Sequence, residues 1–292
     1  MTRPPIAEAL DLEPHPEGGW YRETYRSSVR VEPPGLGAER QAPRGQASPD
    51  GQPRGDLVPR RLDRPPGRWL GSAMWSTDSP RVLERVEGRL GELVLRTDGT
   101  DFEVISNGVF LMDTRNGASE RLLVRVALAG VRAPARLLLG GLGVGFSLAE
   151  ALACDLVERV TVVEIEAAVI RWNRTYLAAH AGRALEDPRV EVVCADLRDW
   201  LGSARQRFEA ICLDVDNGPG WTVAEANGAL YSKASLALLR ERLAPGGALT
   251  IWSANSLDGF TARLRGAFGR VERFAVEVPR GGPDLVYAAW RD

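Results

Sequence analysis

The sequence predicts an α/β fold in which a seven-stranded, mostly parallel sheet follows a small antiparallel β unit. In the second half of the chain, apolar runs alternate with helical segments, and such runs are typical of buried parallel strands. Each run leads into a glycine or ends in a carboxylate, at the sheet edge where open α/β sheets bind ligands. We therefore expect a nucleotide pocket at that edge. The runs are residues 135–139, 160–164, 190–196 and 208–214.

The antiparallel unit is predicted from four shorter apolar runs between residues 72 and 130. Asp-Gly at 98–99 and Asn-Gly at 107–108 separate successive runs, and both dipeptides are strong hairpin signals. An apolar stripe then predicts a helix over residues 119–129, which links this unit to a nucleotide-binding domain over residues 131–292. The four runs are 82–86, 92–96, 102–106 and 109–113.

The remaining elements complete the large sheet. Helical periodicity predicts helices over residues 231–243 and 258–268, and between them an Ala-Pro-Gly-Gly turn precedes a strand over 248–252. The last apolar runs, 271–278 and 285–290, are separated by a Pro- and Gly-rich turn. We expect them to close the sheet as an antiparallel pair.

The first 70 residues have a different character. Residues 12–26 read Leu-Glu-Pro-His-Pro-Glu-Gly-Gly-Trp-Tyr-Arg-Glu-Thr-Tyr-Arg, which resembles the start of a cupin-like family. The strands that a cupin barrel needs do not follow, so residues 1–30 are expected to be a remnant without a function of their own. Residues 31–70 are rich in Pro, Gly and Arg and are expected to form a disordered linker.

The glycine-rich segment after the first parallel strand indicates which nucleotide is bound. Gly141, Gly143 and Gly145 allow a sharp turn and a close approach of the backbone to a ligand. Phe146 stands where a dinucleotide-binding motif needs its last glycine, and the only lysine of the chain, Lys233, is not part of a phosphate loop. The absence of a phosphate clamp favours a nucleoside-type ligand such as S-adenosylmethionine.

Three acids at strand ends are the candidate ligand contacts. Glu164 is placed to accept the ribose hydroxyls and Asp196 to accept the adenine amino group, and Asp214 ends a third strand at the same edge. The alternative is that these acids only cap the following helices. Three acids in register on one sheet edge favour the ligand interpretation.

Composition excludes several classes of function. A net charge of −2 gives no global field that would attract nucleic acid or an anionic membrane. No apolar run has the length of a membrane span and no signal peptide is visible, so a cytoplasmic protein is expected. Two of the three cysteines lie in predicted strands and are expected to be core thiols. With two histidines and no C-x-x-C pair, no metal site is expected.

Gly-Gly-x-Gly-x-Gly, Val-Val-Glu-Ile-Glu and Asp-Pro-Arg-Val, combined with a preceding hairpin unit, resemble the spermidine synthase (polyamine aminopropyltransferase) family over residues 82–255. The resemblance implies a methyltransferase-type, Rossmann-like sheet and an adenosyl donor, decarboxylated S-adenosylmethionine or S-adenosylmethionine. It also implies a small amine acceptor and is compatible with a homodimer. By resemblance, Glu164 and Asp196 hold ribose and adenine, and Asp214 helps to deprotonate the attacking amine.

The chain departs from the family pattern at the acceptor side. Gly143 replaces an aspartate of the glycine loop, and Asp216 is shifted by one position from the second acid of the family's substrate strand. Three interpretations stay open. The chain is an aminopropyltransferase with an acceptor site around Asp214, Asp216, Trp221 and Trp252, an S-adenosylmethionine-dependent methyltransferase, or a non-catalytic binding module. The joint presence of the three acids argues against the last.

Overall fold

The computed structural model describes residues 80–132, 134–215, 228–257, 259–278 and 282–292, together with two short backbone stretches near the start of the chain. These stretches, β1 (Glu13–Pro14) and β2 (Trp20–Tyr21), pair antiparallel with each other. Apart from them, the predicted remnant and linker over residues 1–70 lie outside the described residues. In the part of the chain that the structure describes, no helix is long and apolar enough to cross a membrane.

The predicted antiparallel unit is a four-stranded sheet with the order β3-β4-β5-β6. Asn107 and Gly108, between the last two strands, have φ angles of 51° and 79°, as the predicted Asn-Gly hairpin turn requires. The strands are β3 (Arg81–Gly88), β4 (Gly91–Thr97), β5 (Phe102–Ser106) and β6 (Val109–Asp113).

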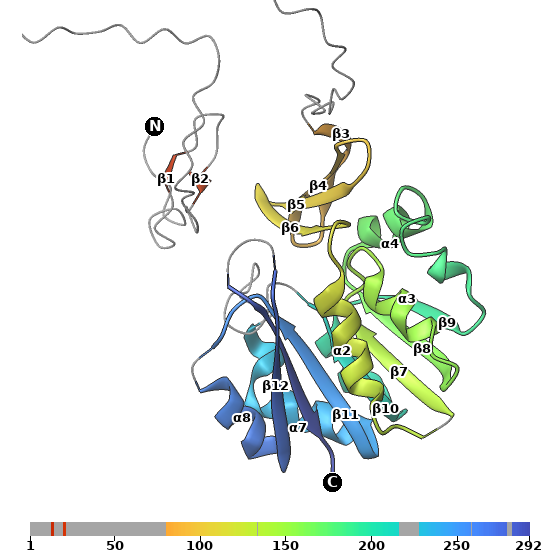
Figure 1. Cartoon of the computed structure of the whole chain (residues 1–292), viewed down its shortest axis with the longest axis vertical. Coiled ribbons are helices and arrows are strands. Elements are labelled where there is room, and N and C mark those ends of the chain that lie inside the picture. The colour runs from red at the N-terminus through yellow and green to blue at the C-terminus, as the bar shows by residue number, and fades with distance from the viewer. Residues whose placement is uncertain are drawn as a thin grey trace, which may run out of the picture. The chain divides into compact units, whose positions relative to one another are not determined.

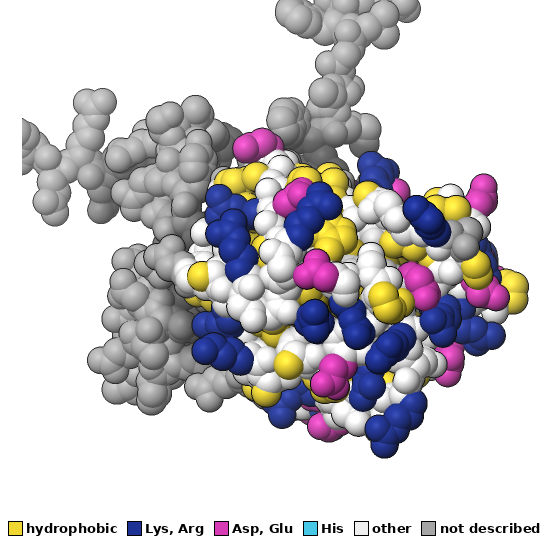
Figure 2. Space-filling view, turned by 90° about the horizontal axis from the view of Figure 1, so that it is seen from below, with side chains coloured by type: hydrophobic (Ala, Val, Ile, Leu, Met, Phe, Trp, Pro, Cys, Tyr) yellow, Lys and Arg dark blue, Asp and Glu magenta, His cyan; other side chains and the backbone are white. Residues whose placement is uncertain are grey.

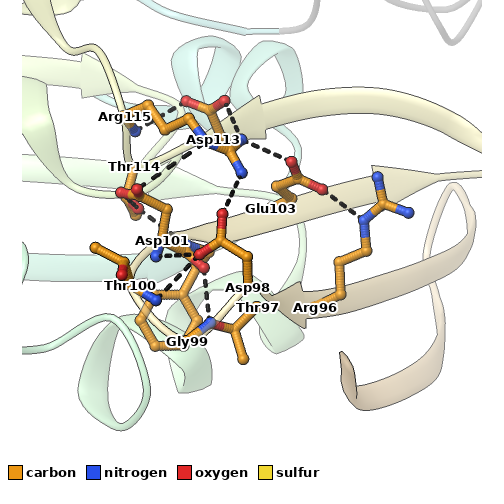
Figure 3. A network of polar contacts seen from close by, with 11 residues as sticks. Arg96, Thr97, Asp98, Gly99, Thr100, Asp101, Glu103, Asp113, Thr114 and Arg115 are labelled. Carbon is orange, nitrogen blue, oxygen red and sulfur yellow. Dashed lines mark hydrogen bonds and ion pairs between the residues drawn. The ribbon is translucent and has the colours of Figure 1, made fainter. Parts of the chain in front are cut away.

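A polar network around Arg115 holds the ends of these strands together (Figure 3). The Arg115 guanidinium lies 2.8 Å from Asp98 Oδ2, 2.6 Å from Glu103 Oε1 and 2.9 Å from Asp113 Oδ2. Hydrogen bonds from the Asp101 backbone N–H and from Arg115 lower the pKa of Asp98 to about 2. The network therefore fixes the β4–β5 turn against the end of β6.

The large sheet has the seven strands that the sequence predicts, and their order is β12-β13-β11-β10-β7-β8-β9 (Figure 1). β13 runs antiparallel to both of its neighbours, and the pairs from β11 to β9 are parallel. The strands are β7 (Ala135–Gly140), β8 (Val157–Glu164), β9 (Val190–Cys194), β10 (Phe208–Leu213), β11 (Leu243–Ser253), β12 (Arg270–Val276) and β13 (Asp284–Trp290).

Helices cover both faces of this sheet because successive strand residues point to opposite sides. Leu137 and Leu139 pack with the helices on one face, and Leu138 with those on the other. The first face carries α2 (Ala118–Leu128), α3 (Phe146–Leu152) and α4 (Ala167–Arg174). The second carries α5 (Leu197–Ser203), α7 (Lys233–Arg242) and α8 (Phe260–Ala267), and η1 (Ala184–Glu186) and η2 (Ala229–Tyr231) are short 3₁₀ turns.

The strand order reverses between β7 and β10. From β7 the chain builds outwards through β8 and β9, then returns to place β10 on the other side of β7. The crevice at such a reversal, beyond the carboxyl ends of the strands, is the ligand site of open α/β sheets. Gly141, which follows β7, and Asp214, which follows β10, meet at this point.

Two details differ from the sequence-based expectation. The Ala-Pro-Gly-Gly segment lies within β11, where Leu243 pairs with Phe208 and Ala248 with Ala210, so the predicted turn is an irregularity inside a strand. Cys212 is buried as expected, but Cys194 is exposed because β9 is the sheet edge. The three cysteines are free thiols.

Figure 2 shows the molecule from below, where Arg and Lys side chains lie across the surface with Asp and Glu side chains between them. Some exposed charges form ion pairs, such as Arg183 with Glu186 at 2.9 Å. Pairs of this kind contribute little stability each. The face in this view presents charges of both signs.

Candidate functional site

The glycine loop joins β7 to α3 and has the backbone geometry that its sequence predicts. Gly141, Gly143 and Gly145 have φ angles of 90°, 55° and 94°, a region that other residues rarely adopt. A Cβ atom on Gly141 would lie 2.1 Å from the carbonyl oxygen of Asp214. Any side chain at this position would therefore push apart β7 and β10 at the reversal point.

Glu164 ends β8 and is only 7% exposed. Its Oε2 accepts a hydrogen bond from the Leu142 backbone N–H of the glycine loop (2.8 Å), and its Oε1 accepts one from the Glu166 N–H (2.8 Å). Burial raises the pKa of Glu164, and the two N–H donors oppose this shift. Each oxygen keeps a second lone pair, so the carboxylate can also accept hydroxyl groups.

Asp196 is the N-cap of α5. Its Oδ1 accepts from the backbone N–H groups of Arg198 (2.8 Å) and Asp199 (3.3 Å). The helix-cap interpretation therefore holds for this residue. The two bonds use only Oδ1, so capping and ligand contact are compatible at Asp196.

Asp214 follows β10, and its backbone N–H donates to the Gly140 carbonyl (2.8 Å). Its side chain is half-buried, with Oδ2 at 3.4 Å from the Ser147 hydroxyl. Burial and the nearby Glu120 carboxyl raise the pKa of Asp214 to about 8, while the Ser147 hydroxyl opposes the shift. The Asp214 carboxyl is therefore harder to ionise than an ordinary aspartate, and a nearby cation would favour its charged form.

Two further acids lie next to Asp214. The Ser119 hydroxyl is 2.9 Å from Glu120 Oε2 and 2.8 Å from Asp284 Oδ2. One hydroxyl carries one proton, so it can donate to only one of the two carboxyls at a time. Burial raises the pKa of both Glu120 and Asp284. We call Glu120, Asp214 and Asp284 the acid cluster.

The acid cluster has few partners for its negative charge. Among the described residues, no Lys or Arg forms an ion pair with any of the three acids. Arg121 lies close enough to lower the pKa of Glu120, but its guanidinium stacks on the Phe146 ring at 4.5 Å. Buried charges are normally paired, so this arrangement is suited to binding a cation.

The structure brings some of the predicted site residues together, and others lie outside the described residues. It brings Gly141, Glu164 and Asp214 together at the strand reversal. Asp216 and Trp221 lie outside the described residues. Trp252 is half-buried on the α2 face of the sheet, and its side chain lies close enough to Asp284 to lower the pKa of that carboxyl. In the described ranges, no group of three or more His, Cys, Asp or Glu side chains is arranged to hold a metal ion.

The sequence-based prediction missed Asp284 and gave Glu120 no role in the site. Asp284 is the first residue of β13, which runs antiparallel to both β11 and β12 in the large sheet. Because β13 runs antiparallel, its first residue reaches the edge where the parallel strands end. An acid at the start of a closing antiparallel strand was the signal that could have found it.

Two known families match the chain. Residues 117–257 match the spermine/spermidine synthase domain, and this range contains the glycine loop, Glu164, Asp196 and Asp214. Residues 5–48 match the cupin superfamily (DUF985). The second match agrees with the predicted resemblance and continues past residue 30, into the segment expected to be a linker.

Curated relatives are polyamine aminopropyltransferases. Polyamine aminopropyltransferase 1 of Streptomyces coelicolor is 37% identical over 135 residues, which are 46% of this chain and 24% of the relative. The Mycobacterium tuberculosis (H37Rv) enzyme is 31% identical over 202 residues, 65% of this chain and 37% of the relative. The Synechococcus enzyme is 29% identical over 57% of this chain and 54% of the relative. The chain thus spans between a quarter and about half of their lengths.

Solved structures share the fold. A spermidine synthase in complex with the transition-state analogue AdoDATO aligns with a TM-score of 0.64 and 19% identity, over 73% of this chain and 74% of that one. The spermidine synthase of Thermotoga maritima aligns with a TM-score of 0.62 and 18% identity, over 73% of each chain. The matched domain, the curated relatives and the shared fold agree, and residues 117–257 are similar to the spermine/spermidine synthase domain.

Proposed function

We propose that this protein transfers an aminopropyl group from decarboxylated S-adenosylmethionine to a small amine, the reaction type of polyamine biosynthesis. The observation that carries the proposal is the acid cluster, which lacks an ion-pair partner among the described residues and lies beside the glycine loop. Amines are cations at neutral pH, and they are the partners that such a cluster lacks.

The donor side supports an adenosyl group. Glu164 is anchored to the glycine loop and has lone pairs left for the two ribose hydroxyls. Asp196 has one carboxylate oxygen left for the adenine amino group. The glycine loop itself offers close backbone approach without a phosphate clamp, which suits a nucleoside rather than a nucleotide.

The acid cluster also favours one donor over the other. S-adenosylmethionine carries a carboxylate on the side chain attached to its sulfonium, and its decarboxylated form does not. A negative group placed beside Asp214 and Glu120 would be repelled, since both already have raised pKa values through burial and their negative neighbours. The decarboxylated donor avoids this repulsion.

The chemistry needs a neutral amine. The acceptor nitrogen attacks the carbon next to the sulfonium sulfur, a C–N bond forms, and the C–S bond breaks with its electron pair moving to sulfur. Methylthioadenosine leaves, and the proton of the amine passes to Asp214. An acid with a pKa of about 8 is well matched to this proton transfer.

Glu120 and Asp284 are proposed to hold the rest of a polyamine acceptor. Both carboxyls contact the Ser119 hydroxyl, so they form one compact anionic pair next to the base. A diamine has a second ammonium group several bonds from the reacting nitrogen, and the pair offers it charge-assisted hydrogen bonds. Function as a homodimer and in the cytoplasm stays a prediction.

The direct test is to incubate the full chain with decarboxylated S-adenosylmethionine and a panel of diamines and polyamines, and to identify the products by mass spectrometry. We expect methylthioadenosine and an aminopropylated amine in equal amounts. Formation of S-adenosylhomocysteine from S-adenosylmethionine would instead identify a methyltransferase. Tight binding of methylthioadenosine with no turnover of any amine would support the binding-module alternative.

A further inference from the structure

A buried carboxylate outside the acid cluster joins the small sheet to the donor site. Glu166, directly before α4, is 7% exposed. Its Oε2 accepts from the Arg89 backbone N–H and its Oε1 from the Leu90 N–H, both at 2.9 Å. Arg89 and Leu90 form the turn between β3 and β4, so this side chain clamps a hairpin of the small sheet onto the large domain.

The backbone of the same residue contacts the donor site. The Glu166 N–H donates to Glu164 Oε1, while the Leu142 N–H holds the other oxygen of Glu164. Glu164 is therefore oriented by two N–H groups, one from the glycine loop and one from the clamped residue. A chain of hydrogen bonds runs from the β3–β4 turn through Glu166 to the ribose-binding carboxylate.

We infer that Glu166 is a positioning residue, which sets the orientation of Glu164 for the ribose by anchoring it to the β3–β4 turn. The inference rests on the proposed donor site, in which Glu164 accepts the ribose hydroxyls. It goes beyond that site because the anchor comes from the small sheet, which has no predicted contact with the nucleoside. The small sheet thereby takes part in donor recognition.

The chemistry of the clamp requires a carboxylate. Two N–H donors face two oxygens, and a glutamine would turn an NH₂ group towards one of them. The turn also requires a glycine next to the clamp. A Cβ atom on Gly88 would lie 2.5 Å from Glu166 Oε2, although the backbone of Gly88 is in a region open to other residues. The variant Gly88→Ala therefore displaces the clamp and keeps its charge.

Losing the negative charge of Glu166 and losing its positioning of Glu164 should change ribose binding in opposite directions. The negative charge of Glu166 contributes to the raised pKa of Glu164, so removing it favours the ionised form of Glu164. Charge removal alone would thus strengthen binding to ribose hydroxyls. A loss of ribose recognition in Glu166→Ala must come from lost positioning.

The experiment measures ribose preference, defined as the ratio of dissociation constants for 2′,3′-dideoxy methylthioadenosine and methylthioadenosine, by calorimetry on the full chain. Loss of a whole charge-assisted hydrogen bond changes affinity by about 10- to 100-fold, so we expect the partial misorientation in Glu166→Ala and Gly88→Ala to lower the preference by about 3- to 10-fold. The double variant should lose no more than either single variant, because the clamp is already broken.

Glu84→Ala is the matched control. Glu84 lies on β3 and accepts from the Trp172 indole N–H of α4 at 2.8 Å, so it joins the same two elements without touching Glu164. This variant should keep the wild-type ribose preference even if its melting temperature falls. An equal loss of preference in Glu84→Ala would mean that any loosening of the junction acts on the ribose, and would overturn the specific role of Glu166.

Two other outcomes are informative in different ways. If the wild type prefers the ribose form and both clamp variants keep that preference, the positioning role is wrong and the donor site stands. If the wild type itself shows no ribose preference, the assignment of Glu164 is wrong, and the inference built on it fails as well. The two failures are therefore distinguishable in one data set.

Discussion

The proposed donor and acceptor sides of the site satisfy their carboxylates in opposite ways. On the donor side, Glu164 and Glu166 each accept two hydrogen bonds from backbone N–H groups. On the acceptor side, Glu120 and Asp284 share one hydroxyl, and Asp214 has one contact at 3.4 Å with Ser147. The donor-side carboxylates are therefore held by hydrogen bonds before a ligand binds, and the acceptor-side carboxylates have too few hydrogen-bond donors.

This difference indicates a division of labour. Backbone N–H groups that are already in place fix a carboxylate in one orientation, which suits recognition of a rigid ribose. Burial raises the pKa of all three acids of the cluster, and a cation that enters would stabilise their charged forms. The donor side should therefore control nucleoside affinity, and the acceptor side should control amine binding, rate and pH dependence.

The largest expected effect is on the acceptor side, from Asp214→Asn. The substitution keeps the shape of the side chain and removes the base that accepts the proton of the amine. We expect turnover to fall by about 10²- to 10⁴-fold, while methylthioadenosine affinity stays within a factor of a few. Steady-state kinetics and calorimetry on the same preparation check both parts. Unchanged turnover would make Asp214 a structural residue, with Asp216 the next candidate.

The pH dependence of the reaction follows from the same residue. The base must be ionised in the free enzyme, and the pKa of Asp214 is about 8. We therefore expect kcat/KM to rise about tenfold per pH unit below pH 8 and to level off above it. In Asp214→Asn this limb should flatten. A wild-type profile that is flat between pH 6 and 8 would contradict the assignment.

On the donor side, Glu164→Ala should weaken nucleoside binding. It removes charge-assisted hydrogen bonds to the ribose, which are worth about 1.5–3 kcal/mol. The dissociation constant for methylthioadenosine should therefore rise by about 10- to 100-fold. Calorimetric titration of the variant measures this change. Equal affinity in wild type and variant would remove the ribose assignment and, with it, the contrast between the two sides.

Asp284→Asn tests whether the acid on β13 belongs to the acceptor side. Loss of one partly exposed carboxylate from a polyamine site should raise KM for the amine by about 5- to 30-fold. The affinity for methylthioadenosine should not change, because Asp284 contacts Ser119 and not the glycine loop. Parallel titrations of amine and nucleoside make the comparison. A loss of nucleoside affinity without a change in KM for the amine would contradict the acceptor role and place Asp284 on the donor side.

Most of the fold could be predicted from the sequence because its signals are local. Apolar runs of strand length, the Asn-Gly turn at 107–108 and the glycine loop determined the order of the elements and the sheet class. The segment after Leu243 was predicted as a turn, since Pro and Gly favour turns. Its pairing with β10 continues after an irregularity, which depends on the neighbouring strand and not on local sequence.

The site could be predicted only in part. Glu164 and Asp214 follow strands whose direction is predictable, so their meeting at one edge could be inferred. Asp284 lies 70 positions beyond Asp214 and joins the cluster only through the antiparallel placement of β13. The clamp at Glu166 depends on where the small sheet docks, which no periodicity or spacing in the chain encodes.

The smallest expected effect concerns stability. We expect the acid cluster to lower the free energy of unfolding. Asp214 has a pKa of about 8 in the folded state, against roughly 3.9 for an unperturbed aspartate. Between these values the folded state binds more protons than the unfolded state, so the free energy of unfolding falls as pH rises from about 4 to 8. Asp214→Asn removes this contribution. It should raise stability at pH 8 by on the order of 1–3 kcal/mol, or about 2–10 °C in melting temperature.

The gain should be smaller at pH 5, where Asp214 is protonated in the wild-type fold and resembles the asparagine. Thermal unfolding of both proteins at pH 5 and pH 8 tests this. Asp196→Asn serves as the matched control, because Asp196 is a helix cap on the donor side. That variant keeps an N-cap side chain and should show no such gain at pH 8. An Asp214→Asn protein that is less stable than wild type at pH 8 would mean that the carboxylate is paired after all. The contrast between a satisfied donor side and an underpaired acceptor side would then fail.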